Sequence, residues 1–198
     1  MSSILLVEGK SDKYFFEFLS KEYNLRFEIH EIGGIDNLKK ALYENIDKYE
    51  NIGIVLDMDN ATIDERLSFV NNCLQEMEIN MVLDKNFDIK EFDGVKIGCF
   101  FINPYLEEFI INISQIEKTA YRCIEHWINC FDPNKERLND REIKKLYYEV
   151  FKKYDICNKK ERQNYQKNCN EKNLFEKMNI NFSKINNIKN FLEELIKC

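Results

Sequence analysis

The sequence predicts an α/β fold, a mainly parallel sheet flanked by helices with a helical C-terminal extension. Three short apolar segments near the start each end in an acid or a glycine pair, and a helical pattern of apolar residues follows each of them. The second half of the chain shows helical periodicity throughout. Alternating strands and helices are typical of parallel sheets, because each crossover helix returns the chain to the same edge. We therefore expect a core over residues 1–115 and an extension over residues 116–198.

The first half is expected to hold five strands and three helices. Apolar or alternating segments predict strands at residues 3–8, 25–32, 52–57, 81–83 and 95–102. Ser11 and Asp36 are expected to cap the first two helices, because a short side-chain oxygen can accept from the free N–H groups of a first turn. The third helix should cover about residues 61–77.

The second half is expected to consist of helices joined by polar segments. Apolar stripes predict helices at residues 106–113, 120–131, 140–154 and 184–197, and Asn139 should cap the third of them. Trp127 and Phe131 fall on these stripes, and Tyr147, Phe151 and Tyr154 are expected in the core. Residues 157–173 are very polar and are expected to form a loop or an exposed helix.

Composition restricts the class of protein. The chain has 198 residues, 44% hydrophobic and 32% charged, which indicates a globule with a core and not a disordered chain. No apolar run approaches the roughly 18–20 residues of a membrane span, and the start reaches Glu8 too early for a secretory signal. None of the seven cysteines forms a C-x-x-C pair, so we expect reduced thiols in a cytoplasmic protein, with no zinc site and no disulfide framework.

Charge is distributed unevenly along the chain. Residues 1–115 carry 11 basic and 22 acidic side chains, whereas residues 116–198 carry 18 basic and 13 acidic ones. An acidic N-terminal part and a basic C-terminal part would suit a metal site beside a surface that binds a polyanion. Lysine-rich, solvated helix faces explain the same numbers equally well.

Three acids follow the predicted strands and are the candidate chemical groups. Glu8 follows the first strand, and Asp57 and Asp59 follow the third. The carboxyl ends of parallel strands form one edge of a sheet, and residues i and i+2 of a strand point the same way, about 6–7 Å apart. Clustered carboxylates repel one another unless a cation is present, and oxygen ligands suit Mg²⁺ or Mn²⁺. Taken singly, each acid could instead be a helix cap.

The same segments resemble a known domain. I-L-L-V-E-G-K-S-D at 4–12, G-G-I-D-N at 33–37 and I-V-L-D-M-D-N at 54–60 resemble the TOPRIM domain, over roughly residues 3–115. The whole chain is similar to small, stand-alone TOPRIM-like proteins related to overcoming-lysogenization-defect (OLD) nucleases. The resemblance implies that Glu8 is a metal ligand or a general acid/base and that Asp57 and Asp59 bind Mg²⁺ or Mn²⁺.

The resemblance also implies supporting roles for neighbouring residues. Gly9 and Lys10 would lie next to the substrate, with Lys10 able to contact a phosphate. Glu107, in a segment that resembles the late strand and following helix of OLD-like proteins, would be a further metal ligand, or else an acid that the helix dipole favours. The residues expected to support the site structurally are Asp12, Gly33 and Gly34.

The leading functional prediction is a metal-dependent nuclease that hydrolyses phosphodiester bonds of DNA or RNA. The alternative is a non-catalytic or conditionally active subunit that works with a separate ABC-type ATPase, since this chain has no phosphate-binding loop of its own. The partners expected for such a protein are nucleic acid and a second copy of the chain in a homo-oligomer, with no membrane. A haloacid-dehalogenase-like phosphatase is a weaker alternative, because Ala61 replaces the Thr or Val of that motif. With only His30 and His126, a histidine-based triad is improbable.

Overall fold

The computed structural model describes residues 2–134 and 136–197, and the fold divides into two units. Unit 1 comprises Met1–Leu106 and Ser183–Cys198, and unit 2 comprises Glu107–Phe182. The sequence placed the boundary at residue 115 and assigned the last helix to the extension. In the structure that helix belongs to the unit that contains the sheet.

Unit 1 is an α/β unit with a five-stranded sheet in the order β2-β1-β3-β5-β4. The strands are β1 (Ser3–Val7), β2 (Glu28–Glu31), β3 (Asn51–Asp57), β4 (Asp88–Phe92) and β5 (Val95–Ile102). All neighbouring pairs are parallel except β4 and β5. The mainly parallel sheet predicted from the alternation of segments is therefore confirmed, and the arrangement is Rossmann-like.

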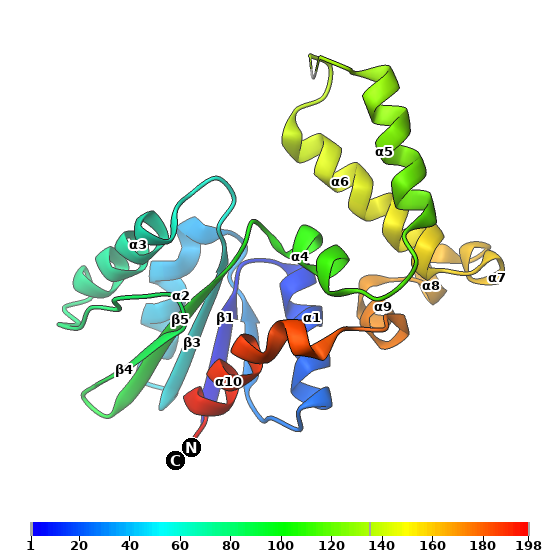
Figure 1. Cartoon of the computed structure of the whole chain (residues 1–198). Helices are drawn as coiled ribbons and strands as arrows, with labels where there is room; N and C mark the ends of the chain where they lie inside the picture. Colours follow the sequence, from blue (N-terminus) through cyan, green and yellow to red (C-terminus); the bar gives the residue numbers. More distant parts are fainter. Residues whose placement is uncertain (1, 135, 198) are drawn as a thin grey trace. The chain divides into compact units, whose positions relative to one another are not determined.

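Helices cover both faces of this sheet, as Figure 1 shows. They are α1 (Lys10–Glu22), α2 (Leu38–Asn45), α3 (Ile63–Gln75) and α10 (Asn186–Leu195), with a 3₁₀ turn at Ile35–Asn37. Side chains of α2 and α3 pack with Ile4, Ile54 and Cys99 on one face. On the other face Phe16 of α1 and Phe191 of α10 both contact Phe100. Burial on both faces explains why β1, β3 and β5 are almost continuously apolar.

Two predictions about the polar region before β5 are wrong. Residues 81–83 form no strand, because the Asn71 side chain bonds both the N–H and the C=O of Leu83 and so replaces a strand partner. The fourth strand is instead Asp88–Phe92, within the segment expected to be a connection. It lies at the edge of the sheet, and all of its residues are charged except Ile89 and Phe92, which suits an edge strand.

In its described part unit 2 is mainly helical, with an isolated antiparallel β-bridge between Ser114 and Ile180. It contains α4 (Leu106–Ile113, whose first residue belongs to unit 1), α5 (Thr119–Phe131), α6 (Asp140–Val150), a π-helical turn (Phe151–Ile156), α7 (Lys159–Arg162), α8 (Tyr165–Asn168) and α9 (Glu171–Lys177). Asn139 caps α6 as predicted, since its Oδ1 accepts from the N–H of Glu142 at 3.0 Å. A 3₁₀ turn at Phe182–Ile185 then leads into α10.

Three aromatic side chains that fall on the predicted apolar stripes are exposed in the structure. Trp127 is 48%, Phe131 39% and Tyr154 50% exposed. Ile128 is the buried residue of the α5 stripe, whereas Trp127 and Phe131 on the same helix are exposed to solvent.

Cys157 and Cys169 form a disulfide, so the expectation of seven reduced thiols is wrong for these two. Both cysteines are buried, and the two short helices α7 and α8 lie between them in the sequence. The chain also contains no described helix that is long and apolar enough to span a membrane.

Candidate active site at the carboxyl edge of the sheet

Glu8 and Asp57 lie side by side at the carboxyl ends of two neighbouring strands. Glu8 directly follows β1 and Asp57 is the last residue of β3, and the two strands pair in parallel with Val7 opposite Val55. The backbone N–H of Asp57 points at Oε2 of Glu8, 3.4 Å away. Both side chains are half-buried. Parallel pairing thus brings together two acids that are 49 residues apart in the chain.

Asp57 is held in place from its other side. Its Oδ1 accepts a hydrogen bond from the backbone N–H of Leu106, 3.1 Å away. Its backbone pairs with Ile102 at the end of β5. One carboxylate oxygen of Asp57 therefore anchors the start of α4.

Asp59 does not continue the strand, so the i, i+2 argument does not apply to it. Strand β3 ends at Asp57, and Asp59 has a positive φ of 50° in the following turn. Its N–H donates to the carbonyl of Pro104 at 2.7 Å, and its Oδ2 lies 3.2 Å from Nη2 of Arg66. The carboxylate of Asp59 is therefore directed to an arginine of α3.

Arg66 is a site residue that the sequence did not reveal. Its side chain is only 14% exposed, and Nη2 also donates to the carbonyl of Met58 at 3.2 Å. Its Nε is buried without a hydrogen-bond partner. The sequence does give a signal for it, since Arg66 is one of few arginines and lies in the second turn of the helix that follows Asp59.

Gly9 and Asp12 form the turn from Glu8 into α1. The N–H of Gly9 donates to Oδ2 of the buried Asp12 at 3.0 Å. A Cβ at Gly9 would lie 3.3 Å from that same oxygen, so a side chain here would disturb the turn. Gly9, not Ser11, is the N-cap of α1. Lys10 is exposed, with its Nζ 5.8 Å from the centre of the Tyr14 ring.

Gly33 and Gly34 contact the site through the backbone of Glu8. Their two N–H groups donate to the carbonyl oxygen of Glu8, both at 3.1 Å. Their φ angles of 73° and 114° belong to the region that only glycine adopts easily. This turn fixes the strand end that carries Glu8.

The acids at this edge of the sheet lie further apart than the ligands of a compact metal site. Among residues 2–134 and 136–197, the group of three possible ligands within 4.8 Å of one another is Cys157, Glu161 and Cys169. Two of those are bonded to each other as a disulfide, and sulfur does not suit Mg²⁺ or Mn²⁺. Glu107 belongs to unit 2, so the site described here consists of residues from unit 1 alone.

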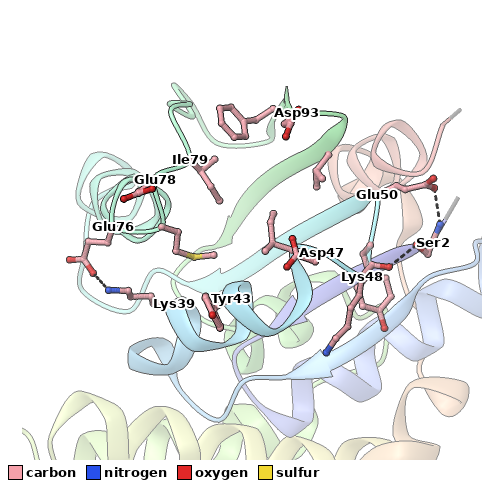
Figure 2. Close-up of a pocket in the computed structure, with 15 residues that line it drawn as sticks. Ser2, Lys39, Tyr43, Asp47, Lys48, Glu50, Glu76, Glu78, Ile79 and Asp93 are labelled. Atoms are coloured by element: carbon pink, nitrogen blue, oxygen red, sulfur yellow. Dashed lines mark hydrogen bonds and ion pairs between the residues drawn. The ribbon is translucent and has the colours of Figure 1, made fainter.

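A large open hollow of about 1000 Å³ lies at the opposite edge of the sheet. Figure 2 shows Ser2, which precedes β1, and Glu50, which precedes β3, on its wall. Lys39 is paired there with Glu76 at 2.6 Å. Size alone would favour this hollow as the functional site. We take the carboxyl edge as the candidate site, because crossover loops meet there and because the Glu8 carboxylate meets the backbone N–H of Asp57 there.

Comparison with known protein families gives a match over nearly the whole chain. The family described as "Protein of unknown function (DUF3226)" matches residues 2–197. No curated protein and no solved structure matches the chain.

Proposed function

The chain belongs to the DUF3226 family, and we propose that it is a nuclease of the TOPRIM type that hydrolyses phosphodiester bonds of DNA or RNA with Mg²⁺ or Mn²⁺. The observation that carries the proposal is the approach of Glu8 to Asp57 at the carboxyl edge of a mainly parallel sheet. Asp59 follows in the next turn, in the order and at the spacing of the TOPRIM motifs.

The residues of this edge fit a hard divalent cation. Glu8, Asp57 and Asp59 offer only carboxylate oxygens, which are the ligands that Mg²⁺ and Mn²⁺ prefer. When bound, such a cation supplies positive charge for the phosphate and acidity for a water molecule. The chain itself contributes the positions of the carboxylates, and Glu8 is the candidate to take up or release a proton. Cys99, buried behind this edge, is no nucleophile, because burial raises the pKa of its thiol to about 12.

We expect the purified chain to cleave plasmid DNA, single-stranded DNA or RNA when Mn²⁺ or Mg²⁺ is added, and to stop when the metal is chelated. Glu8→Gln should lower the rate by about 100-fold or more, because a positioned acid/base contributes about that much. Glu91→Gln on β4 is the matched control, since Glu91 is exposed and paired with no site residue. Cleavage that is insensitive to both metal and Glu8→Gln would refute the proposal.

The ion pair between Arg66 and Asp59 favours a second candidate function, a subunit that is active only with a partner ATPase. A cation that binds Asp59 must compete with the guanidinium 3.2 Å away. A partner that draws Arg66 aside would therefore switch the site on. Co-purification with such an ATPase, together with cleavage only in its presence, would support this candidate over the first.

Replacing Arg66 by glutamine tests that competition directly. We expect Mn²⁺ to bind about threefold more tightly, the factor that a partly exposed ion pair is worth, because glutamine removes the charge that competes for Asp59. Isothermal titration calorimetry measures the affinity, and Arg26→Gln at an exposed position of unit 1 is the control. Unchanged or weaker binding in Arg66→Gln would contradict the prediction.

A further inference from the structure

Unit 2 exposes a series of flat side chains on α5 and the turn that follows it. The rings of Trp127 and Phe131 lie one helical turn apart and are stacked, with centres 4.8 Å apart and planes 9° from parallel. The guanidinium of Arg137 lies 4.9 Å from the centre of the Phe131 ring. At 48% exposure, Trp127 presents the largest aromatic surface of the series to solvent. Such an arrangement offers a ready stacking surface for another planar group.

A buried carboxylate holds this series in position. Asp132, only 4% exposed, accepts hydrogen bonds from the backbone N–H groups of Glu136, Arg137 and Leu138 at 2.8–3.0 Å. Burial alone would raise the pKa of Asp132, but these three bonds outweigh it and lower the pKa, so the group is ionised near neutrality. The turn that places Arg137 over Phe131 is therefore built into the fold.

Charge in unit 2 suits a polyanion. Unit 2 carries 15 basic and 13 acidic residues, whereas unit 1 carries 14 basic and 22 acidic ones. Within residues 152–167 there are six basic and two acidic residues. Lys152 is buried and paired with Glu149, which leaves the other five basic residues for a polyanion. The two acids are already engaged, because Asp155 accepts from the first N–H groups of α5 and Glu161 pairs with Lys177 at 2.7 Å.

The same basic segment holds a second exposed ring. Tyr154 is 50% exposed, and the cationic groups of Lys153 and Arg162 lie 5.4 and 5.3 Å from its centre. Exposed aromatic rings accompanied by cations therefore occur at two places in unit 2. This combination is typical of proteins that bind single-stranded nucleic acid, in which bases stack on rings and phosphates meet cations.

We propose that unit 2 binds single-stranded nucleic acid, with a base stacked on Trp127 and phosphates held by basic residues of the segment 152–167. Single strands are favoured because a paired base does not expose its face for stacking. An apolar protein partner would bury the guanidinium of Arg137 without a counter-charge, which is costly. The choice of nucleic acid as ligand rests in part on the proposed function, but binding does not require cleavage.

The chain contains a single tryptophan, so its fluorescence reports on this surface alone. We expect titration with a 20-nucleotide oligothymidylate, in EDTA to prevent cleavage, to quench the emission of Trp127. Trp127→Ala should weaken binding of a labelled oligonucleotide by about tenfold, as the loss of one stacked base predicts. Tyr43→Ala, at a 75% exposed aromatic residue of unit 1, should leave binding unchanged.

A second variant does not depend on how Trp127→Ala folds. The affinity for the oligonucleotide should fall as the salt concentration rises. In Lys159→Gln the slope of log affinity against log salt concentration should be smaller by about one phosphate contact. Absence of quenching, or equal affinity of all variants, would overturn the inference. Trp127 emission that changes with protein concentration but not with oligonucleotide would also overturn it, because α5 would then be a contact between copies of the chain. Binding in EDTA without cleavage in Mn²⁺ would refute only the proposed nuclease, and cleavage without quenching would refute only this inference.

Discussion

Replacing Asp57 by asparagine is expected to lower metal-dependent cleavage by about 10³-fold, which corresponds to about 4 kcal/mol of transition-state stabilisation. Asp57 lies between Glu8 and the start of α4, and the substitution removes the negative charge of its side chain. The Oδ1 of asparagine can still accept from the N–H of Leu106, so the backbone around the site should stay in place. Initial rates on the best substrate, with Mn²⁺ at saturation for the unmodified chain, measure the effect.

A thermal measurement separates lost chemistry from lost folding. A ligand that binds only the folded state raises the melting temperature, so Mn²⁺ should stabilise the unmodified chain but not Asp57→Asn. In EDTA the variant should melt at the same temperature or higher, because one of several neighbouring negative charges is gone.

Asp93→Asn is the matched control for this substitution. Asp93 is exposed in the turn between β4 and β5 and has a φ of 50°, which asparagine tolerates well. The control makes the same change of charge at the opposite edge of the sheet. Equal losses in the two variants, or full activity in Asp57→Asn, would remove Asp57 from the active site.

Sequence reasoning reached the position of Glu8 and Asp57 because strand order and chain direction decide it. Acids that directly follow parallel strands lie at the same end of the sheet, and this does not depend on the conformation of the loops. The orientation of Asp59 was beyond such reasoning, because it depends on a left-handed residue and on the carbonyl of Pro104 after the far end of β5. Arg66 was missed for a related reason, since contacts across a turn are set by the turn's conformation.

Helical periodicity identified the helices of unit 2 but not which of their faces are covered. It placed Trp127 and Phe131 on a buried stripe, whereas both are exposed. The sequence shows which residues lie on one side of a helix but not how deeply each of them is buried. One buried residue such as Ile128 with two exposed neighbours therefore gives the same pattern as three buried residues. The same limit explains why the last helix was assigned to the extension, because an apolar face in the sequence does not identify the sheet or helix against which it packs.

The attachment of α10 to the sheet depends on two glycines that pair across β3 and β5. Gly53 lies opposite Gly98. A Cβ at Gly53 would come within 2.8 Å of Leu195, and one at Gly98 within 3.0 Å of Phe191, so the missing side chains make room for the helix. Phe191 fills this room and meets the Phe100 ring edge-on, with centres 5.0 Å apart. These contacts explain why residues 183–198 belong to unit 1.

Phe191→Ala should therefore lower the free energy of unfolding of unit 1 by about 4 kcal/mol, the usual cost of removing a buried phenylalanine. Denaturant unfolding followed by circular dichroism measures the loss, and Tyr43→Ala, at an exposed position of α2, should change it by less than about 0.5 kcal/mol. A chain truncated after residue 115 also lacks α10 and should be at least as unstable as Phe191→Ala. If that truncated chain instead unfolded at the same denaturant concentration as the full chain, α10 would be an appendage, and the boundary at residue 115 would be the correct one.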